Sequence, residues 1–91
     1  MIYKIEFKEQ ANKDLVALAR YEPKAFLKAQ ALIGELKTHP RTGTGRPELL
    51  SRDQAGLWSR RITQKHRLVY EIRDTEVVVL VLTAYGHYGD K

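Results

Sequence analysis

The chain has 91 residues, 43% of them hydrophobic, which suffices for one compact domain and leaves no room for a second independent one. It contains no cysteine, which excludes disulfides and thiolate metal sites. The net charge is +5, and the segment sums are +2 for residues 1–38, +5 for residues 39–67 and −2 for residues 68–91. A basic surface concentrated in this way attracts polyanions, although a solvated, solubilising face explains the same charge equally well.

The start of the chain and its apolar runs bear on where the protein works. Charged residues interrupt the first nine positions, at Lys4, Glu6, Lys8 and Glu9, so we expect no signal peptide. The longest apolar run spans residues 77–82 and is too short to cross a bilayer. We therefore expect a cytoplasmic protein with a single domain over residues 1–91 and no membrane contact.

The first 36 residues predict a strand and two helices. Polar and apolar residues alternate over residues 2–7, as in a half-buried strand, and the expected inner face comprises Tyr3, Ile5 and Phe7. The next segment repeats apolar residues at helical spacing, at Ala11, Leu15, Leu18 and Ala19. The exposed face of this helix should carry Lys8, Glu9, Lys13 and Asp14. Pro23 suits the first turn of a second helix, whose apolar stripe comprises Phe26, Ala29, Ile33 and Leu36.

The second half of the chain predicts a surface loop and three strands. Two prolines and two glycines lie between Thr38 and Pro47, which is typical of irregular structure. Strands are expected over residues 57–63, 67–73 and 76–84, joined by short turns. An N-terminal strand, a two-helix hairpin and a three-stranded antiparallel meander predict an α+β fold. Its sheet should be mostly antiparallel, with both helices packed on one face.

Alternation along these strands separates the two faces of the sheet. The side chains expected to point at the helices are Ile62, Leu68, Tyr70 and Ile72. Arg61 and Arg67 then lie together on the open face. Arg60 points the other way and should reach past the sheet edge or extend over core side chains. Trp58 shares the inner phase and is expected to anchor the core, with base stacking as the alternative.

The titratable residues disfavour a metal-dependent nuclease. The three histidines, His39, His66 and His87, do not have metal-ligand spacing. The sequence also lacks a His-Glu-x-x-His motif and an acidic cluster typical of a magnesium site, so we expect no metal and no cofactor. A Ser/His/Asp hydrolase is disfavoured because there is no Gly-x-Ser-x-Gly motif.

Metal-free acid–base cleavage of RNA is compatible with the sequence. RNA supplies its own 2′-hydroxyl nucleophile, so the protein needs a base, cations for the phosphate charge and an acid for the departing 5′ oxygen. A carboxylate, arginine and histidine suit these roles, and the chain offers Glu48, Arg61, Arg67 and His87, with Tyr88 adjacent. Each of them also has an ordinary explanation as a solvated or packing residue. Composition and spacing by themselves indicate only a basic α/β domain suited to binding RNA.

Three segments resemble the YoeB/Txe toxins of the RelE superfamily. The central one reads Gly-Leu-Trp-Ser-Arg-Arg-Ile-Thr over residues 56–63 and continues as His-Arg-Leu-Val-Tyr over residues 66–70. Residues 43–48 end in Gly-Arg-Pro-Glu, and residues 86–88 read Gly-His-Tyr. The resemblance implies a RelE-like fold and a ribosome-dependent mRNA interferase, which is the toxin of a type II toxin–antitoxin module.

The resemblance also implies roles for individual residues. Glu48 matches the family's general base, Arg67 its phosphate-stabilising arginine, His87 its general acid and Tyr88 its site tyrosine. Arg61 matches a basic site residue. The residues expected to contact RNA are Arg52, Arg60, Arg61 and Lys65. Leu49 follows Glu48 where the family often has a proline, which could change how Glu48 is aimed.

The partners implied by the resemblance are an antitoxin of the YefM/Phd type, messenger RNA in the ribosomal A site, and ribosomal RNA. A toxin homodimer or a toxin–antitoxin hetero-oligomer is then expected. One alternative is a gyrase inhibitor of the same superfamily, which the set Glu48, Arg67, His87 and Tyr88 disfavours. Another is an RNA-binding module without catalysis. A third is a toxin that keeps the fold but whose activity is lowered by Leu49 or by the tail after Tyr88.

Overall fold

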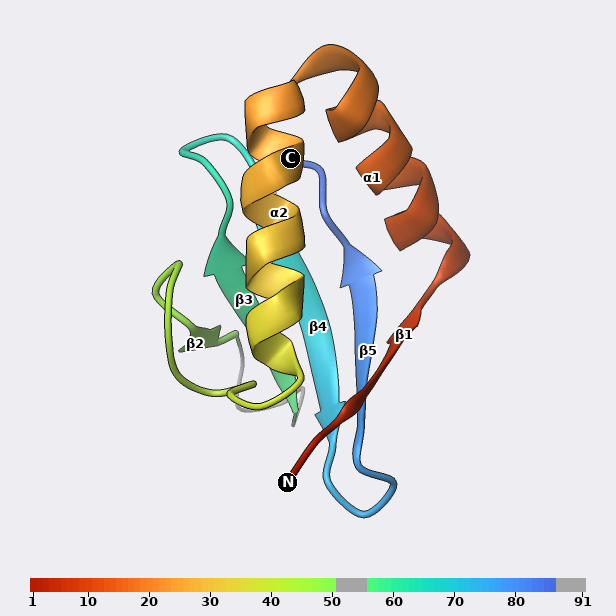
Figure 1. The fold of residues 1–91 in the computed structure, drawn as a ribbon, viewed down its shortest axis with the longest axis vertical. Coiled ribbons are helices and arrows are strands. Elements are labelled where there is room, and N and C mark those ends of the chain that lie inside the picture. The colour runs from red at the N-terminus through yellow and green to blue at the C-terminus, as the bar shows by residue number, and fades with distance from the viewer. Residues whose placement is uncertain (51–55, 87–91) are drawn as a thin grey trace.

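The computed structural model describes residues 1–50 and 56–86, which form two helices and a five-stranded sheet (Figure 1). The elements in chain order are β1 (Lys4–Phe7), α1 (Glu9–Tyr21), α2 (Pro23–Leu36), β2 (Glu48–Leu49), β3 (Leu57–Arg61), β4 (Arg67–Arg73) and β5 (Val78–Thr83). The strands lie in the order β1-β5-β4-β3-β2, in which β1 runs parallel to β5 and the other neighbours are antiparallel. The predicted α+β fold is confirmed.

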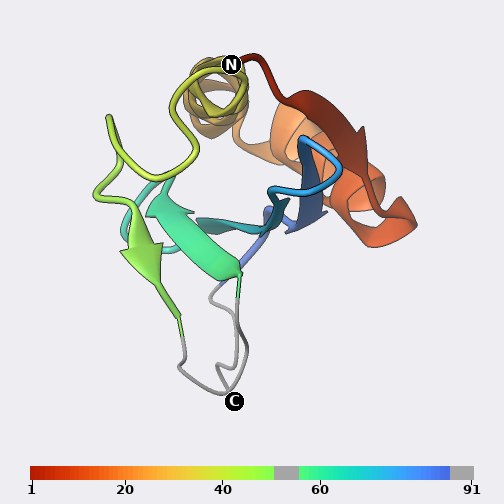
Figure 2. The ribbon, with the colours of Figure 1, turned by 90° about the horizontal axis from the view of Figure 1, so that it is seen from below.

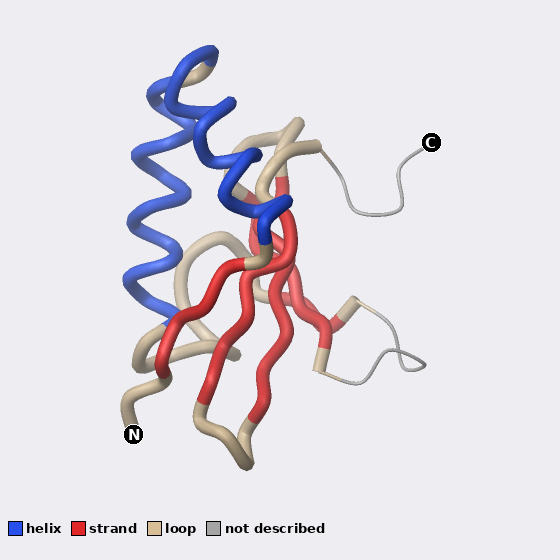
Figure 3. The backbone as a smooth tube through the Cα atoms, turned by 90° about the vertical axis from the view of Figure 1, so that its right-hand side faces the viewer, coloured by secondary structure: helices blue, strands red, loops and turns tan. Residues whose placement is uncertain are grey.

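Both helices pack on the same face of the sheet, as predicted (Figures 2 and 3). The four strand residues expected to face them, Ile62, Leu68, Tyr70 and Ile72, are all buried in the core. Ala29 and Leu36 of the predicted α2 stripe are fully buried, and Trp58 is partly buried against the same core. Alternation of apolar residues therefore assigned the faces of β3 and β4 correctly. Within the described residues, neither helix has the length and hydropathy to cross a bilayer.

The break between the two helices follows from Pro23. Proline disfavours helical backbone at the residue before it, and Glu22 has φ −142° and ψ 70°. Helix α1 therefore ends at Tyr21, and Pro23 takes the first turn of α2, where its missing N–H is not needed. Glu22 is left at the junction, with its side chain free to reach the sheet.

Asp14 corrects the prediction for the exposed face of α1. Its side chain is buried, at 8% exposure, because its carboxylate accepts hydrogen bonds from the Ala84 backbone N–H at 2.9 Å and from Gln10 at 2.8 Å. A carboxylate can leave water when donors replace the lost hydration. In the apolar sets, Ala19 is exposed, and Phe7 remains 38% exposed because it ends the edge strand β1.

Strand β2 was not predicted, since residues 38–47 read as a loop and the next expected strand began at residue 57. It has only two residues, and its partner β3 lies later in the chain, with Glu48 opposite Ser59 and Leu49 opposite Trp58. A strand this short has no alternation to detect, so only its pairing defines it. This pairing turns Glu48 from a loop residue into part of the sheet edge.

Candidate active site

The open face of the sheet brings Arg61 and Arg67 together. They are direct partners across β3 and β4, and both are partly buried. Residues opposite each other in an antiparallel pair project from the same face, with Cβ atoms about 4.5–5.5 Å apart. The prediction that these two arginines share the open face is confirmed.

Glu48 lies on this face as well. It is exposed and pairs with Ser59, which stands two residues before Arg61 on β3. Glu48 is thus a diagonal neighbour of Arg61, a relation that spans about 7–8 Å. Ser59 and its β4 partner Val69 project from the same face and are buried. The long side chains of Glu48, Arg61 and Arg67 can therefore reach one ligand on this face.

Two like charges directly opposite each other destabilise a sheet, so an anion bound to both arginines would reduce their repulsion. The hydrogen bonding of Arg61 is unusual for a buried donor. Its Nε is buried and, among the described residues, has no hydrogen-bond partner. A buried donor without an acceptor is uncommon in native proteins and costs free energy. Two paired guanidinium groups, one of them with a donor left free within the described part of the chain, are chemically able to bind an oxyanion such as a phosphate.

Arg60 does not belong to this surface, and its predicted role in RNA binding is corrected. Its side chain is fully buried on the helix side of β3. Its Nη1 donates to Glu35 at 2.8 Å and to the Thr44 carbonyl at 3.3 Å, and its Nη2 donates to the carbonyls of His39 and Thr42. The guanidinium is thus occupied within the protein. It extends over the core side chain of Tyr70, which is the second of the two expected placements, and presents no charge to a ligand.

The contacts of Arg60 fix the loop that leads to Glu48. Its Nε donates to the Tyr70 hydroxyl at 3.1 Å, and that hydroxyl donates to the Pro40 carbonyl at 2.8 Å. Burial raises the pKa of Tyr70, which keeps the hydroxyl protonated as a donor. A loop rich in proline and glycine forms few regular backbone hydrogen bonds. The buried guanidinium of Arg60 therefore supplies donors to the loop carbonyls. Arg60 therefore holds residues 39–44 in place, and this loop leads to Glu48.

Glu35 ties the same loop to helix α2. Its Oε1 accepts from the Thr44 N–H at 2.9 Å and from Arg60 at 2.8 Å. Hydrogen bonds from Thr44, together with Arg60, hold the pKa of Glu35 below its ordinary value. A carboxylate with a lowered pKa in the folded state stabilises the fold at neutral pH. That contribution disappears as the pH falls through the folded-state value.

Stability should therefore depend on pH through Glu35. We expect the free energy of unfolding to fall on acidification from pH 7 to below the ordinary glutamate value of 4.5, and Glu35→Gln to fall less steeply. Urea denaturation of both proteins across this range measures the difference. Glu9→Gln, on exposed surface of α1, controls for the loss of a charge. Parallel curves for the wild type and Glu35→Gln would contradict the assignment.

The last described residues lie beside Arg67. The Arg67 backbone N–H donates to the Gly86 carbonyl at 2.9 Å, so the end of the described chain is next to the arginine pair. The predicted site residues His87 and Tyr88, and the predicted RNA contact Arg52, lie outside the described residues. Lys65 stands in the exposed turn between β3 and β4, with its ammonium 3.6 Å from Glu22.

Sequence reasoning missed three groups around this site: Asp14, Glu22 and His66. Asp14 and His66 accept hydrogen bonds from the backbone N–H groups of Ala84 and Gly86, and Glu22 contacts the other nitrogen of His66. Only His66 gave a signal, as one of three histidines, and nothing in its spacing indicated burial. These contacts join residues distant in sequence, so spacing could not reveal them.

Comparison with known proteins identifies the family of this fold. Residues 7–88 match the family model of the YoeB-like toxin of bacterial type II toxin-antitoxin systems. The chain belongs to the YoeB toxin family. Toxin YoeB of Mycobacterium bovis is 38% identical over 84 residues, which cover 92% of this chain and 96% of that protein.

Solved structures of YoeB toxins have the same fold. The YoeB/ParE toxin from Agrobacterium tumefaciens superposes with a TM-score of 0.85 at 34% identity, covering 93% of this chain and 99% of that one. YoeB from Staphylococcus aureus is 29% identical and covers 97% of this chain and 100% of its own. Its TM-scores are 0.82 as a dimer and 0.78 in a YoeB–YefM complex. The RelE-like fold implied by the sequence motifs is thereby confirmed.

Proposed function

We propose that this YoeB-family chain is a metal-independent endoribonuclease, the toxin of a type II toxin–antitoxin module, which cleaves messenger RNA in the ribosomal A site. The observation that carries the proposal is the open face, where Arg61 and Arg67 are paired and Glu48 is their neighbour on β2. A carboxylate beside two arginines suits a phosphodiester whose neighbouring hydroxyl must lose a proton.

The proposed reaction uses the nucleophile that RNA itself carries. Glu48 takes the proton from the 2′-hydroxyl, and the 2′ oxygen attacks phosphorus. Arg67, with Arg61, stabilises the negative charge that develops on the phosphate oxygens, since guanidinium forks match phosphate geometry. The bond from phosphorus to the 5′ oxygen breaks, and His87 donates a proton to that oxygen. The products are a 2′,3′-cyclic phosphate and a 5′-hydroxyl. Tyr88 is proposed to assist at the same phosphate.

The proposed partners follow from the family and from charge. The Staphylococcus aureus relative has been solved with YefM and as a dimer, so we propose an antitoxin of the same type for this chain. We further propose that Lys65 and Arg52 contact ribosomal RNA, because Lys65 is 70% exposed in its turn. Charge reversal, Lys65→Glu, should weaken co-sedimentation with ribosomes, and unchanged co-sedimentation would refute this contact.

Primer extension on a reporter messenger RNA tests the proposal. The translation mix is assembled with and without ribosomes, and the wild type is compared with Glu48→Ala and His87→Ala. We expect cleavage only with ribosomes, and a rate reduced on the order of 10²-fold or more in either variant, since each removes a positioned proton-transfer group. Glu76→Ala, an exposed carboxylate in the turn before β5, serves as the control and should cleave normally.

Each other outcome of this experiment points to a different reading. Cleavage of naked RNA would refute ribosome dependence. No cleavage in either mix would favour a toxin that acts by binding, such as a gyrase inhibitor, or a non-catalytic RNA-binding module. Full activity of Glu48→Ala would remove Glu48 as the base.

A further inference from the structure

We propose that His66, oriented by Glu22, is a positioning residue that holds the backbone of Gly86 and so sets the start of the segment carrying His87. This inference rests on the proposed function, because it concerns the placement of the proposed general acid. His66 itself is fully buried and does not reach the open face as a reacting group.

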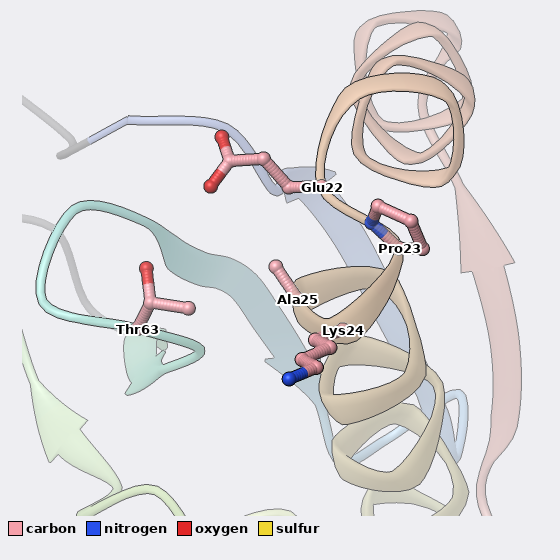
Figure 4. Close-up of a pocket in the computed structure, with 5 residues that line it drawn as sticks. All are labelled: Glu22, Pro23, Lys24, Ala25 and Thr63. Carbon is pink, nitrogen blue, oxygen red and sulfur yellow. The ribbon is translucent and has the colours of Figure 1, made fainter.

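Both ring nitrogens of His66 are engaged. Its Nε2 lies 2.6 Å from Glu22 Oε2, and its Nδ1 lies 2.8 Å from the backbone nitrogen of Gly86. The ring also packs against Tyr85, with centroids 4.3 Å apart and planes tilted by 52°. His66 thus links the junction of the two helices to the chain that follows β5. Figure 4 shows the Glu22 side chain extending from the helix junction toward the chain that follows β5.

The hydrogen bonds determine which tautomer His66 must adopt. A backbone N–H can only donate, so Nδ1 must be unprotonated to accept from Gly86. Nε2 must then carry the proton and donate a hydrogen bond to Glu22. The Glu22 carboxylate thereby selects this tautomer, because a carboxylate accepts only from a protonated ring nitrogen. The hydrogen bond from His66 lowers the pKa of Glu22, so the carboxylate stays ionised as the acceptor.

The chain before His87 is fixed at three atoms. The Ala84 N–H donates to Asp14 of α1 at 2.9 Å, and the Gly86 N–H donates to His66. The Gly86 carbonyl accepts from the backbone N–H of Arg67 at 2.9 Å. Gly86 has φ +74°, a conformation that other residues adopt at a cost. Since Arg67 also supplies the proposed phosphate contact, these bonds set Gly86 relative to the arginine that holds the substrate.

Two substitutions of His66 separate positioning from packing. In His66→Asn, the side-chain oxygen lies near the position of Nδ1 and can accept from Gly86, but it does not reach Glu22. In His66→Gln, the amide nitrogen lies near the position of Nε2 and can donate to Glu22, but nothing accepts from Gly86. Both remove the ring and its contact with Tyr85, so a purely structural role predicts equal effects.

Glu22→Gln supplies a third variant that should fold, because Glu22 is partly exposed. A glutamine at this position can donate to Nε2 and favour the wrong tautomer, with a proton on Nδ1. That tautomer cannot accept from Gly86. Glu9→Gln, on the same hairpin, removes an exposed carboxylate and is the matched control.

The experiment measures single-turnover cleavage of messenger RNA on programmed ribosomes at increasing toxin concentration, corrected for the folded fraction. We expect His66→Gln and Glu22→Gln to lower the rate at saturation on the order of 10²-fold, because small misplacements of a catalytic group have effects of this size. The toxin concentration at half-maximal rate should hardly change. His66→Asn should retain most of the rate. Equal losses in His66→Asn and His66→Gln, or full activity of His66→Gln, would overturn the inference.

Amide hydrogen exchange at Gly86 gives a readout that does not depend on RNA. The Gly86 amide should exchange slowly in the wild type and in His66→Asn, and faster in His66→Gln and Glu22→Gln. No cleavage by the wild type would refute the proposed function, and with it the catalytic consequence of His66. Normal cleavage by His66→Gln with a fast-exchanging Gly86 amide would refute only the present inference.

Discussion

Replacement of Arg60 by alanine should lower the free energy of unfolding by about 3 kcal/mol, since each buried acceptor that loses its donor costs about 1–3 kcal/mol. The guanidinium is fully buried and donates to Glu35, to the Tyr70 hydroxyl and to three carbonyls of the loop before Glu48. Its removal takes a donor from the Tyr70 hydroxyl and from the three loop carbonyls, and it leaves Glu35 with the hydrogen bond from Thr44. A domain of this size is stable by only about 5–15 kcal/mol, so a large share of its stability depends on one side chain.

Arg61→Ala is the matched control for this prediction, since Arg61 is the next residue on β3 and faces the opposite side. It should not lower the free energy of unfolding, because it removes a buried donor that is unpaired among the described residues and the repulsion from Arg67, and it should instead reduce cleavage. Chemical denaturation of both variants measures the difference. Comparable stability of Arg60→Ala and Arg61→Ala would contradict the assignment of Arg60 to the loop.

The second large effect is expected at Arg67. Replacing it with alanine should lower the rate of RNA cleavage on the order of 10²–10³-fold, as loss of one group that stabilises transition-state charge does elsewhere. Arg67→Lys should restore only part of the rate, because an ammonium keeps the charge but not the planar fork. The free energy of unfolding should hardly fall in either variant, since the substitution also relieves repulsion from Arg61.

Arg73→Ala is the control for Arg67, because Arg73 lies on the same strand in the same phase, next to Glu71. Its guanidinium is 3.4 Å from the Glu71 carboxylate, so its charge is already compensated. Cleavage by Arg73→Ala should match the wild type. Equal losses at positions 67 and 73 would indicate a general electrostatic effect and not a phosphate site at Arg67.

Local sequence determined most of the secondary structure and the faces of the central strands. Alternation identified the inner residues of β3 and β4, and Pro23 marked the start of α2, because these signals depend on neighbouring residues. The same alternation put Arg61 and Arg67 on one face. The motif around these arginines is also typical of the family.

Tertiary structure alone decided the rest, because it depended on partners distant in the chain. Pairing with β3 made a strand of Glu48 and Leu49. Donors from Ala84 and Gln10 allowed Asp14 to be buried. Arg60 and Arg61 are adjacent and chemically identical, yet loop carbonyls and Glu35 surround one, whereas the other faces Arg67 across the sheet. Sequence gives the face of the strand on which each arginine lies, but only the fold supplies the acceptors that bind the Arg60 guanidinium and that the Arg61 Nε lacks among the described residues.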